Sequence, residues 1–207
     1  MPGYVDSFDT YITDVLRLGG IISEERPGKK IFLLGESMGG LITFLTAIEH
    51  PHPFAGVILI SPAFTSKLKF TPIDYLMMAA SLLYDPKKNF IVPFKSEMCT
   101  RDVEYQKMLD SDPKEHRIAT SKLFFNVSLA QARSRMEKSN LKLPSLFLVA
   151  GDDSLVYTSS TKKIFSALKT EDKKLIEYPG MRHALSIELG KEKVFDDILR
   201  WTMERYK

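Results

Sequence analysis

A serine between two glycines stands at residues 35–39, in the order Gly-Glu-Ser-Met-Gly. A serine hydroxyl becomes a strong nucleophile when a neighbouring base takes its proton, so such a residue can attack a carbonyl carbon. The pattern is typical of a tight strand-to-helix turn, which lifts the hydroxyl above the sheet. Ser37 is therefore our candidate nucleophile, and the backbone N–H of Met38 is a candidate donor to an oxyanion. The alternative is a glycine-rich turn with an idle serine.

His183 is the candidate base among the four histidines of the chain. It follows the predicted strand at residues 174–178, so it belongs to a loop at the carboxyl end of that strand. Ser37 lies at such an end too, and ligands of open α/β sheets bind at that edge. His50 and His52 stand beside Pro51 at a predicted helix end, and His116 lies in a charged stretch, which indicates surface positions.

An acid must orient the imidazole of such a base. Asp152 and Asp153 both follow the apolar run at residues 146–150, and adjacent residues project differently, so only one of them can face His183. The order serine, aspartate, histidine, each after its own strand, is the chain order of one large class of hydrolases. Spacing alone leaves the choice between the two aspartates open.

Strands alternating with helices must position these residues. Apolar runs bounded by turn residues predict strands at residues 31–34, 57–60 and 146–150, and the rhythm of strands and helices continues with a fourth strand at residues 174–178. Apolar residues at helical spacing predict helices at 5–18, 39–50, 158–169 and 191–206, the first of them ended by Gly19 and Gly20. This alternation predicts an α/β fold with a parallel sheet covered on both faces. The inner face of the last helix should contain Val194, Phe195, Ile198, Leu199 and Trp201.

Residues 66–140 have a different character. They contain no strand-like run, mix apolar with charged residues, and are interrupted by four prolines. We therefore expect several short helices that form an insertion, with residues 1–65 and 141–207 forming the core.

Composition narrows the class of protein. The chain has 207 residues, 44% of them apolar and 27% charged, which suits one soluble domain with a core. The net charge of +3 is spread out, with pairs such as Lys87-Lys88 as the longest clusters, so we expect no nucleic-acid partner. Cys99 is the single cysteine, which favours a reducing, cytoplasmic compartment. The histidines and carboxylates lack the spacing of metal ligands, and the chemistry above needs no metal or other cofactor.

With these motifs the chain resembles the α/β-hydrolase family, and within it the monoacylglycerol lipase and lysophospholipase-like branch. The matching stretches are VDSFDTYITDV, IFLLGESMGGLI, GVILISPAF, LFLVAGDDSLV and YPGMRHAL. The resemblance implies that Ser37 is the nucleophile and His183 the base. In that family the acid is followed by one residue and an apolar pair, which favours Asp153 over Asp152.

The resemblance also implies a substrate site. Residues 66–140 stand where the family has a helical cap over its acyl-binding pocket, so we expect a small lipid-like ester as substrate and peripheral membrane contact through the cap. The expected substrate-binding residues are Glu36, Phe64, Phe70, Met77 and Met78, and Leu76, Leu82 and Leu83 are further cap residues that could line the pocket. Two alternatives remain open, namely an aminopeptidase or thioesterase with the same three residues, or a hydrolase-like remnant with little activity.

The chain departs from the family before the strand-to-helix turn at Ser37, which is called the nucleophile elbow. The family has four strands before the first helix seen here, and a His-Gly loop among them supplies the second oxyanion donor. We therefore expect a truncated form of a longer hydrolase. Loss of one such donor lowers turnover about a hundred- to thousandfold. The strand before Ser37 should then be an open sheet edge, through which the chain should self-associate.

Overall fold

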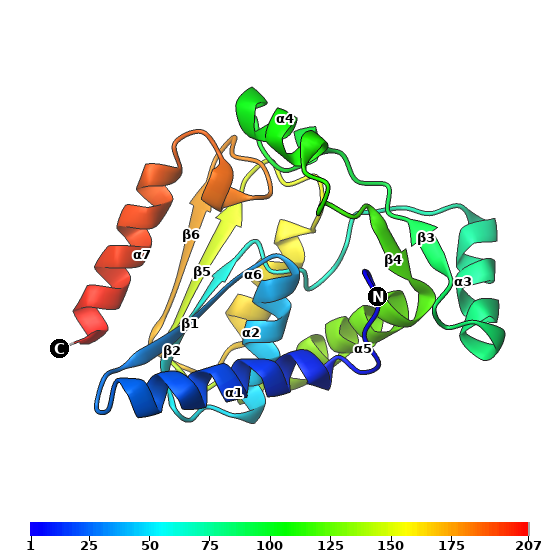
Figure 1. Ribbon diagram of the computed structural model, residues 1–207. Helices are drawn as coiled ribbons and strands as arrows, with labels where there is room; N and C mark the ends of the chain where they lie inside the picture. Colours follow the sequence, from blue (N-terminus) through cyan, green and yellow to red (C-terminus); the bar gives the residue numbers. More distant parts are fainter. Residues whose placement is uncertain (207) are drawn as a thin grey trace.

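The computed structural model describes residues 1–206 and contains one parallel sheet of four strands in the order β1-β2-β5-β6 (Figure 1). The strands are β1 (Ile31–Glu36), β2 (Phe54–Ile60), β5 (Ser145–Ala150) and β6 (Lys173–Tyr178). Each neighbouring pair is parallel, with Gly35 beside Leu59 and Ala150 beside Tyr178 near the carboxyl ends. The predicted sheet is confirmed, with each strand one to three residues longer than the range predicted for it.

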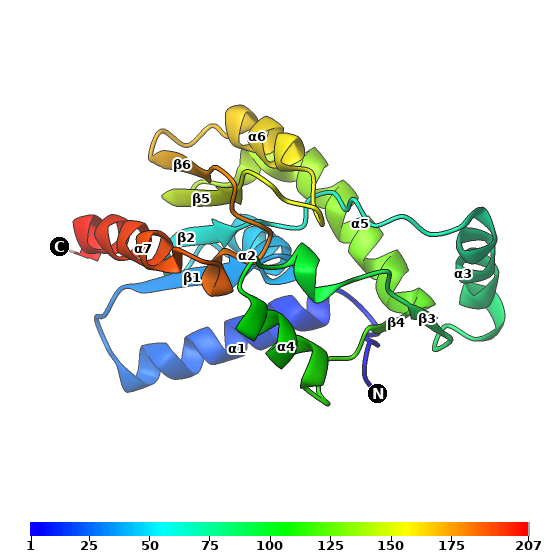
Figure 2. The ribbon, with the colours of Figure 1, turned by 90° about the horizontal axis from the view of Figure 1, so that it is seen from above.

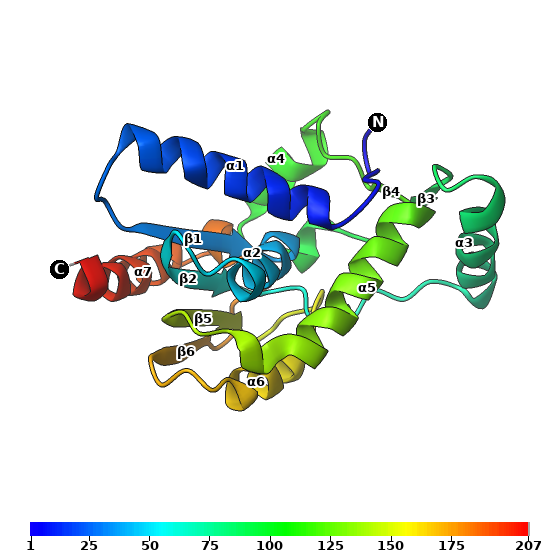
Figure 3. The same ribbon diagram turned by 90° about the horizontal axis from the view of Figure 1, so that it is seen from below.

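Helices cover both faces of this sheet (Figures 2 and 3). Alternate residues of a strand point to opposite faces, so Val57 and Leu59 of β2 join one core cluster, while Ile58 and Ile60 join the other. The first cluster includes residues of α1 (Asp9–Glu25), α2 (Met38–Glu49) and α6 (Thr158–Ala167). The second is closed by α7 (Lys191–Tyr206). The predicted α/β architecture is therefore confirmed.

The first helix does not end at Gly19 and Gly20 as the sequence predicted. It begins at Asp9 and continues to Glu25. Gly19 is buried, and a Cβ atom there would lie 3.2 Å from the ring of Phe54. The glycine thus lets the helix approach β2 closely, and this packing outweighs the low helix propensity of the Gly-Gly pair.

The last helix presents a narrower inner face than expected. Val194 and Trp201 are buried and Ile198 packs against them, a spacing of four and three residues along one stripe. Phe195 and Leu199 are exposed, so the prediction for these two residues was wrong.

Residues 66–140 form a segment that we call the cap segment, on the side of the sheet toward which the strands point (Figure 1). Its elements are α3 (Pro72–Tyr84), β3 (Asn89–Ile91), η1 (Ser96–Met98), α4 (Val103–Ser111), β4 (Ile118–Thr120), α5 (Ser121–Glu137) and η2 (Lys138–Asn140). The expectation of short helices alone was wrong, because β3 and β4 pair as antiparallel strands and α5 has 17 residues. Strands of three residues are too short to leave an apolar run in the sequence.

The cap segment is tied to the start of the chain. The carbonyl oxygen of Gly3 accepts hydrogen bonds from the N–H and the hydroxyl of Thr120, at 2.9 and 2.7 Å. The side chain of Asn126 donates to the carbonyl of Val5. Residues 3–6 therefore run along β4 and α5, as the position of the N-terminus in Figure 1 also shows. Among residues 1–206, no helix is both long and apolar enough to cross a bilayer.

Candidate active site

Ser37 stands at the turn between β1 and α2. Its φ and ψ are +56° and −118°, a strained conformation that few residues with a side chain adopt. Its N–H donates to the carbonyl of Ile60, and its own carbonyl accepts from the N–H of Ala63, both at 2.9 Å. The end of β2 and the residues just after it thus hold the backbone of Ser37 in the geometry expected for a nucleophile elbow.

Gly35 is the glycine that this turn requires. A Cβ atom at Gly35 would lie 2.2 Å from the carbonyl oxygen of Gly39 and 2.6 Å from the hydroxyl oxygen of Thr43. At Gly39 itself a Cβ atom would meet no atom within 4 Å. The close approach of strand and helix therefore rests on the first glycine of the motif.

His183 bridges Ser37 and Asp153. Its Nε2 atom lies 2.8 Å from the hydroxyl oxygen of Ser37, and its Nδ1 atom lies 2.8 Å from Oδ2 of Asp153. His183 and Asp153 are both buried. The three residues follow β1, β5 and β6, so the topology that the sequence predicted brings them together at one edge.

Asp153 is held in this position by its own loop. Its Oδ1 atom accepts hydrogen bonds from the N–H groups of Leu155 and Val156, at 2.8 and 2.9 Å, which leaves Oδ2 for His183. Asp152 is exposed, and its backbone N–H donates to the carbonyl of Met181. The structure therefore places Asp153, and not Asp152, beside the imidazole.

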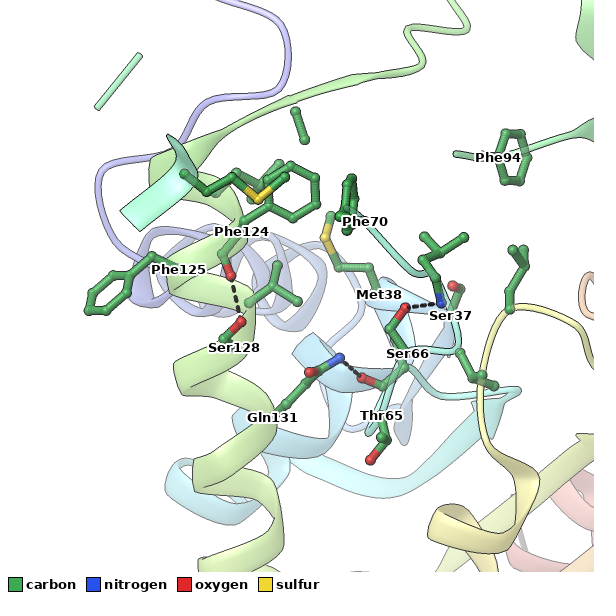
Figure 4. Close-up of a pocket in the computed structure, with 18 of the residues that line it drawn as sticks. Ser37, Met38, Thr65, Ser66, Phe70, Phe94, Phe124, Phe125, Ser128 and Gln131 are labelled. Carbon is green, nitrogen blue, oxygen red and sulfur yellow. Dashed lines mark hydrogen bonds between the residues drawn. The ribbon is translucent and has the colours of Figure 1, made fainter. Parts of the chain in front are cut away.

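A cavity of about 960 Å³ opens at Ser37, between the core and the cap segment. Figure 4 shows Phe124 and Gln131 of α5 on one side of it and Ser37 and Thr65 on the other. Met38 also lines the cavity. It is the first residue of α2, so its N–H has no carbonyl partner within the helix and can serve an oxyanion beside Ser37.

The expected substrate-binding residues divide into two groups. Glu36, Phe70 and Met78 line the cavity. The carboxylate of Glu36 accepts hydrogen bonds from the hydroxyl and the N–H of Ser186, at 2.6 and 3.2 Å. Glu36, Phe70 and Met78 therefore form part of the cavity wall.

Phe64 and Met77 are not part of the cavity wall, so their assignment is corrected. Phe64 is fully buried and packs edge-on against Phe44 of α2, with ring centroids 4.8 Å apart. Met77 is exposed on the outer side of α3, where Leu76 and Leu83 are exposed too, while Leu82 does line the cavity. A helix presents adjacent residues to different surroundings, so the apolar run at 76–78 could not all face inward.

The contribution of α5 to the cavity was not predicted from the sequence. Leu123, Phe124, Val127 and Gln131 line it. They recur at intervals of three and four residues after Thr120, whose hydroxyl accepts a hydrogen bond from the N–H of Leu123 and caps the helix. This spacing was visible in the sequence and could have identified the helix that faces the site.

Comparison with known families agrees with this geometry. The family model described as serine aminopeptidase, S33, a hydrolase family, matches residues 1–190. The chain belongs to this α/β-hydrolase family. Human monoglyceride lipase is 33% identical to it over 206 residues, which cover 97% of this chain and 67% of that relative.

Solved structures of α/β-hydrolases have the same fold. The monoacylglycerol lipase of Paleococcus ferrophilus is 25% identical with a TM-score of 0.83, over 94% of this chain and 76% of that one. A soluble variant of monoglyceride lipase from Saccharomyces cerevisiae, solved with a substrate analogue, has a TM-score of 0.84 at 20% identity. That match covers 99% of this chain and 72% of the yeast chain. The chain is thus a lipase-like member of the α/β-hydrolases.

Proposed function

We propose that this chain hydrolyses carboxylic esters of lipid-like substrates, of the monoacylglycerol or lysophospholipid type, through an acyl-enzyme on Ser37. One observation carries the proposal. The Ser37 hydroxyl lies 2.8 Å from Nε2 of His183 and opens into a large, mostly apolar cavity. Such a cavity suits an acyl chain, with few polar groups near the reacting carbonyl. The relatives named monoglyceride lipase support the same substrate class.

In the first half of the reaction, Nε2 of His183 takes the proton of Ser37 as the serine oxygen attacks the ester carbonyl carbon. Asp153 holds the imidazole in the required tautomer and stabilises the imidazolium. The N–H of Met38 donates to the oxyanion of the tetrahedral intermediate. His183 then gives the proton to the leaving alcohol oxygen as the carbon–oxygen bond breaks, and the acyl group remains on Ser37.

In the second half, a water molecule takes the place of the alcohol. His183 removes a proton from this water as its oxygen attacks the acyl carbonyl, and returns the proton to the serine oxygen when the fatty acid leaves. Phe70 and Met78 supply apolar contacts for the acyl chain, while Glu36 supplies a polar wall beside Ser37. Residues 66–140 act in this scheme as the cap that closes the acyl site against the core of residues 1–65 and 141–207.

Labelling with a fluorophosphonate probe tests the nucleophile directly. We expect the folded protein to be labelled and Ser37→Ala to remain unlabelled, because the probe reacts with a serine that a base activates. Ser166→Ala is the matched control, since that hydroxyl lies on α6 and donates to the carbonyl of Lys162. A folded wild-type protein that takes up no label would contradict the proposal.

Turnover with different acyl groups tests the substrate class. We expect monoacylglycerols and p-nitrophenyl esters to be cleaved, and aminoacyl amides and acyl thioesters to be cleaved much more slowly. Preferred cleavage of aminoacyl amides would indicate a peptidase instead, and preferred cleavage of thioesters would indicate a thioesterase. The fold and the three residues do not fix the leaving group, so this comparison decides between classes.

We further propose that the cap segment touches a lipid surface. Ile73, Leu76 and Leu83 are exposed on α3, and Leu83 is 92% exposed. Lys87 and Lys88 follow α3 closely in the sequence, and cations near an apolar surface suit anionic lipid headgroups. An exposed apolar helix beside a cavity for lipid substrates supports contact at the surface from which those substrates come.

Sedimentation with vesicles of phosphatidylcholine and phosphatidylserine tests this contact. We expect Leu83→Glu to reduce the bound fraction severalfold, because the change puts a charge where apolar surface enters the headgroup region. Hydrolysis of a soluble short-chain ester should remain at the wild-type rate, since Leu83 lies outside the cavity. Equal vesicle binding by the two proteins would refute the role of α3.

A further inference from the structure

Glu188 is a buried carboxylate on the loop that carries His183. Its side chain is 0% exposed, although it lies outside the cavity and outside the proposed mechanism. An ionised side chain without water needs several hydrogen-bond donors to compensate for its burial. The donors that surround it show what Glu188 holds together.

Two donors come from its own loop. The N–H of Arg182 donates to Oε2 of Glu188 at 2.8 Å, and the N–H of Leu189 donates to Oε1 at 2.7 Å. Arg182 directly precedes His183 in the chain. The carboxylate therefore fixes the peptide group next to His183.

The other donors come from the cap segment. The N–H of Arg101 donates to Oε1 at 3.1 Å, its Nε atom lies 3.3 Å from the same oxygen, and the hydroxyl of Thr100 lies at 3.4 Å. Burial alone would raise the pKa of Glu188, but the N–H groups of Arg182, Leu189 and Arg101, with the Arg101 charge, lower that pKa below its usual range. The ionised form thus joins two segments that are some ninety residues apart in the sequence.

Further contacts join the same two segments on either side of His183. The N–H of Ala184 donates to the carbonyl of Cys99 at 2.9 Å, and the guanidinium of Arg182 donates to the carbonyl of Glu97 at 2.6 Å. Cys99 and Ala184 both line the cavity. The wall that faces the substrate and the loop that carries the base therefore form one connected unit.

We propose that Glu188 is a positioning residue for His183, which it holds in register with the cap segment through hydrogen bonds to the N–H groups of Arg182 and Arg101. This inference rests on the proposed role of His183 as the base. Glu188 touches neither substrate nor reacting atoms. It acts by keeping Nε2 of His183 at hydrogen-bond distance from Ser37 while Nδ1 faces Asp153.

The variant Glu188→Gln tests this role with almost no change in side-chain volume. In the wild type, backbone N–H groups donate to both carboxylate oxygens of Glu188. The glutamine amide would replace one of these oxygens with an N–H₂ group, which is itself a donor, so the loop must shift. A small displacement of a catalytic group strongly lowers the rate of the chemical step. We therefore expect kcat to fall about 10- to 100-fold while KM stays within about twofold. The rate of fluorophosphonate labelling should fall in parallel. Glu177→Gln is the matched control, because Glu177 pairs with Lys162 on the surface of β6.

A spectroscopic readout separates positioning from simple loss of structure. The proton between Nδ1 of His183 and Asp153 should give a far-downfield proton NMR resonance in the wild type, which Glu188→Gln should weaken or shift. Titration of active sites with the fluorophosphonate gives the folded, reactive fraction of each sample. The proposal is overturned if kcat per titrated site and the resonance both match the wild type.

A second variant tests the same role if Glu188→Gln does not fold. Arg101→Ala retains the backbone N–H and removes the side chain with its guanidinium, so we expect a smaller fall in kcat in a folded protein. An unchanged kcat and resonance in that folded variant would overturn the link to the cap. Absence of labelling in the wild type, with a resonance that Glu188→Gln still alters, would instead defeat the proposed function and leave the positioning intact.

Discussion

Asp152 and Asp153 are neighbours in the sequence but have different surroundings. Asp153 is buried, accepts two backbone N–H groups and faces His183, whereas Asp152 is exposed. We predict that Asp153→Asn lowers kcat about 10⁴-fold, because an amide there favours the wrong tautomer of the imidazole. Asp152→Asn should leave kcat within about twofold, since an exposed side chain contributes little to a buried hydrogen-bond pair.

Steady-state hydrolysis of a p-nitrophenyl ester by the two variants measures this difference. Circular dichroism on the same samples shows whether both are folded. An equal loss in the two variants, or a larger loss in Asp152→Asn, would mean that the acid has been assigned to the wrong residue.

Cys99 lies in the cavity wall, but its thiol should react slowly. Burial, with the charges of Glu36, Glu115 and Asp153, raises the pKa of Cys99 to about 12, so the thiol is protonated at pH 8. Because the thiolate is the reactive form, we predict that iodoacetamide alkylates the native protein about a thousandfold more slowly than the same chain in urea. Mass spectrometry after timed quenching gives both rates, and similar rates would show that the thiol is ionised or accessible in the native state.

At the scale of elements, the elbow depends on the strand and helix that meet at Gly35. We predict that Gly35→Ala lowers the free energy of unfolding by about 3 kcal/mol, because its Cβ atom would overlap the carbonyl of Gly39. Gly39→Ala is the matched change, since open space surrounds that position. It should leave the free energy unchanged or raise it by up to about 1 kcal/mol through helix propensity.

Urea unfolding followed by tryptophan fluorescence measures both free energies, with Trp201 buried against the sheet as the probe. If the two alanine variants were equally stable, the close approach of β1 and α2 could not be what requires a glycine.

The elements of the core were predictable because their signals are local. Runs of apolar residues between turns mark β1, β2 and β5, and β6 continues the alternation of strands and helices. The order of serine, aspartate and histidine after β1, β5 and β6 predicts where their side chains meet. The continuation of α1 past Gly19 was not predictable, since it depends on packing against Phe54, about 35 residues further along the chain. The strands β3 and β4 depend in the same way on pairing across the cap segment.

The cavity and the buried carboxylate were harder to predict for the same reason. Phe64 and Phe70 are both aromatic residues just after β2, yet only Phe70 reaches the cavity, because Phe64 packs on α2. In the sequence, nothing distinguishes Glu188 from other acidic residues that precede a helix. Its contacts form only because the fold brings the segments at 97–101 and 182–189 together. Tertiary contacts between distant segments decide these positions, and a single sequence does not display them.

At the scale of the whole molecule, cap and core are joined at several points around the cavity. Gln131 of α5 donates to the carbonyl of Ala63 at 2.9 Å, and Asn126 donates to the carbonyl of Val5. Arg135 donates to the carbonyl of Phe64 at 2.9 Å. Together with the contacts of Glu188, these hydrogen bonds join the cap segment to residues 1–65 and 141–207 at several places.

The sheet itself ends at β1, which is the first strand in the order β1-β2-β5-β6. Within residues 1–206 no strand pairs with its outer side, and Leu34 of β1 is 53% exposed. An apolar strand with unpaired N–H and C=O groups is a template for pairing with another chain. We therefore predict that the chain of 207 residues self-associates through β1.

Sedimentation velocity over a range of concentrations tests this association. Leu34→Lys should shift the distribution toward the monomer, because a charge on an edge strand disfavours edge-to-edge pairing. Leu129→Lys is the matched control, since Leu129 is also 53% exposed but lies on α5. A wild-type chain that sediments as a monomer at every concentration, with ordinary thermal stability, would show that β1 is no pairing surface, and the exposure of Leu34 would then have no consequence for assembly.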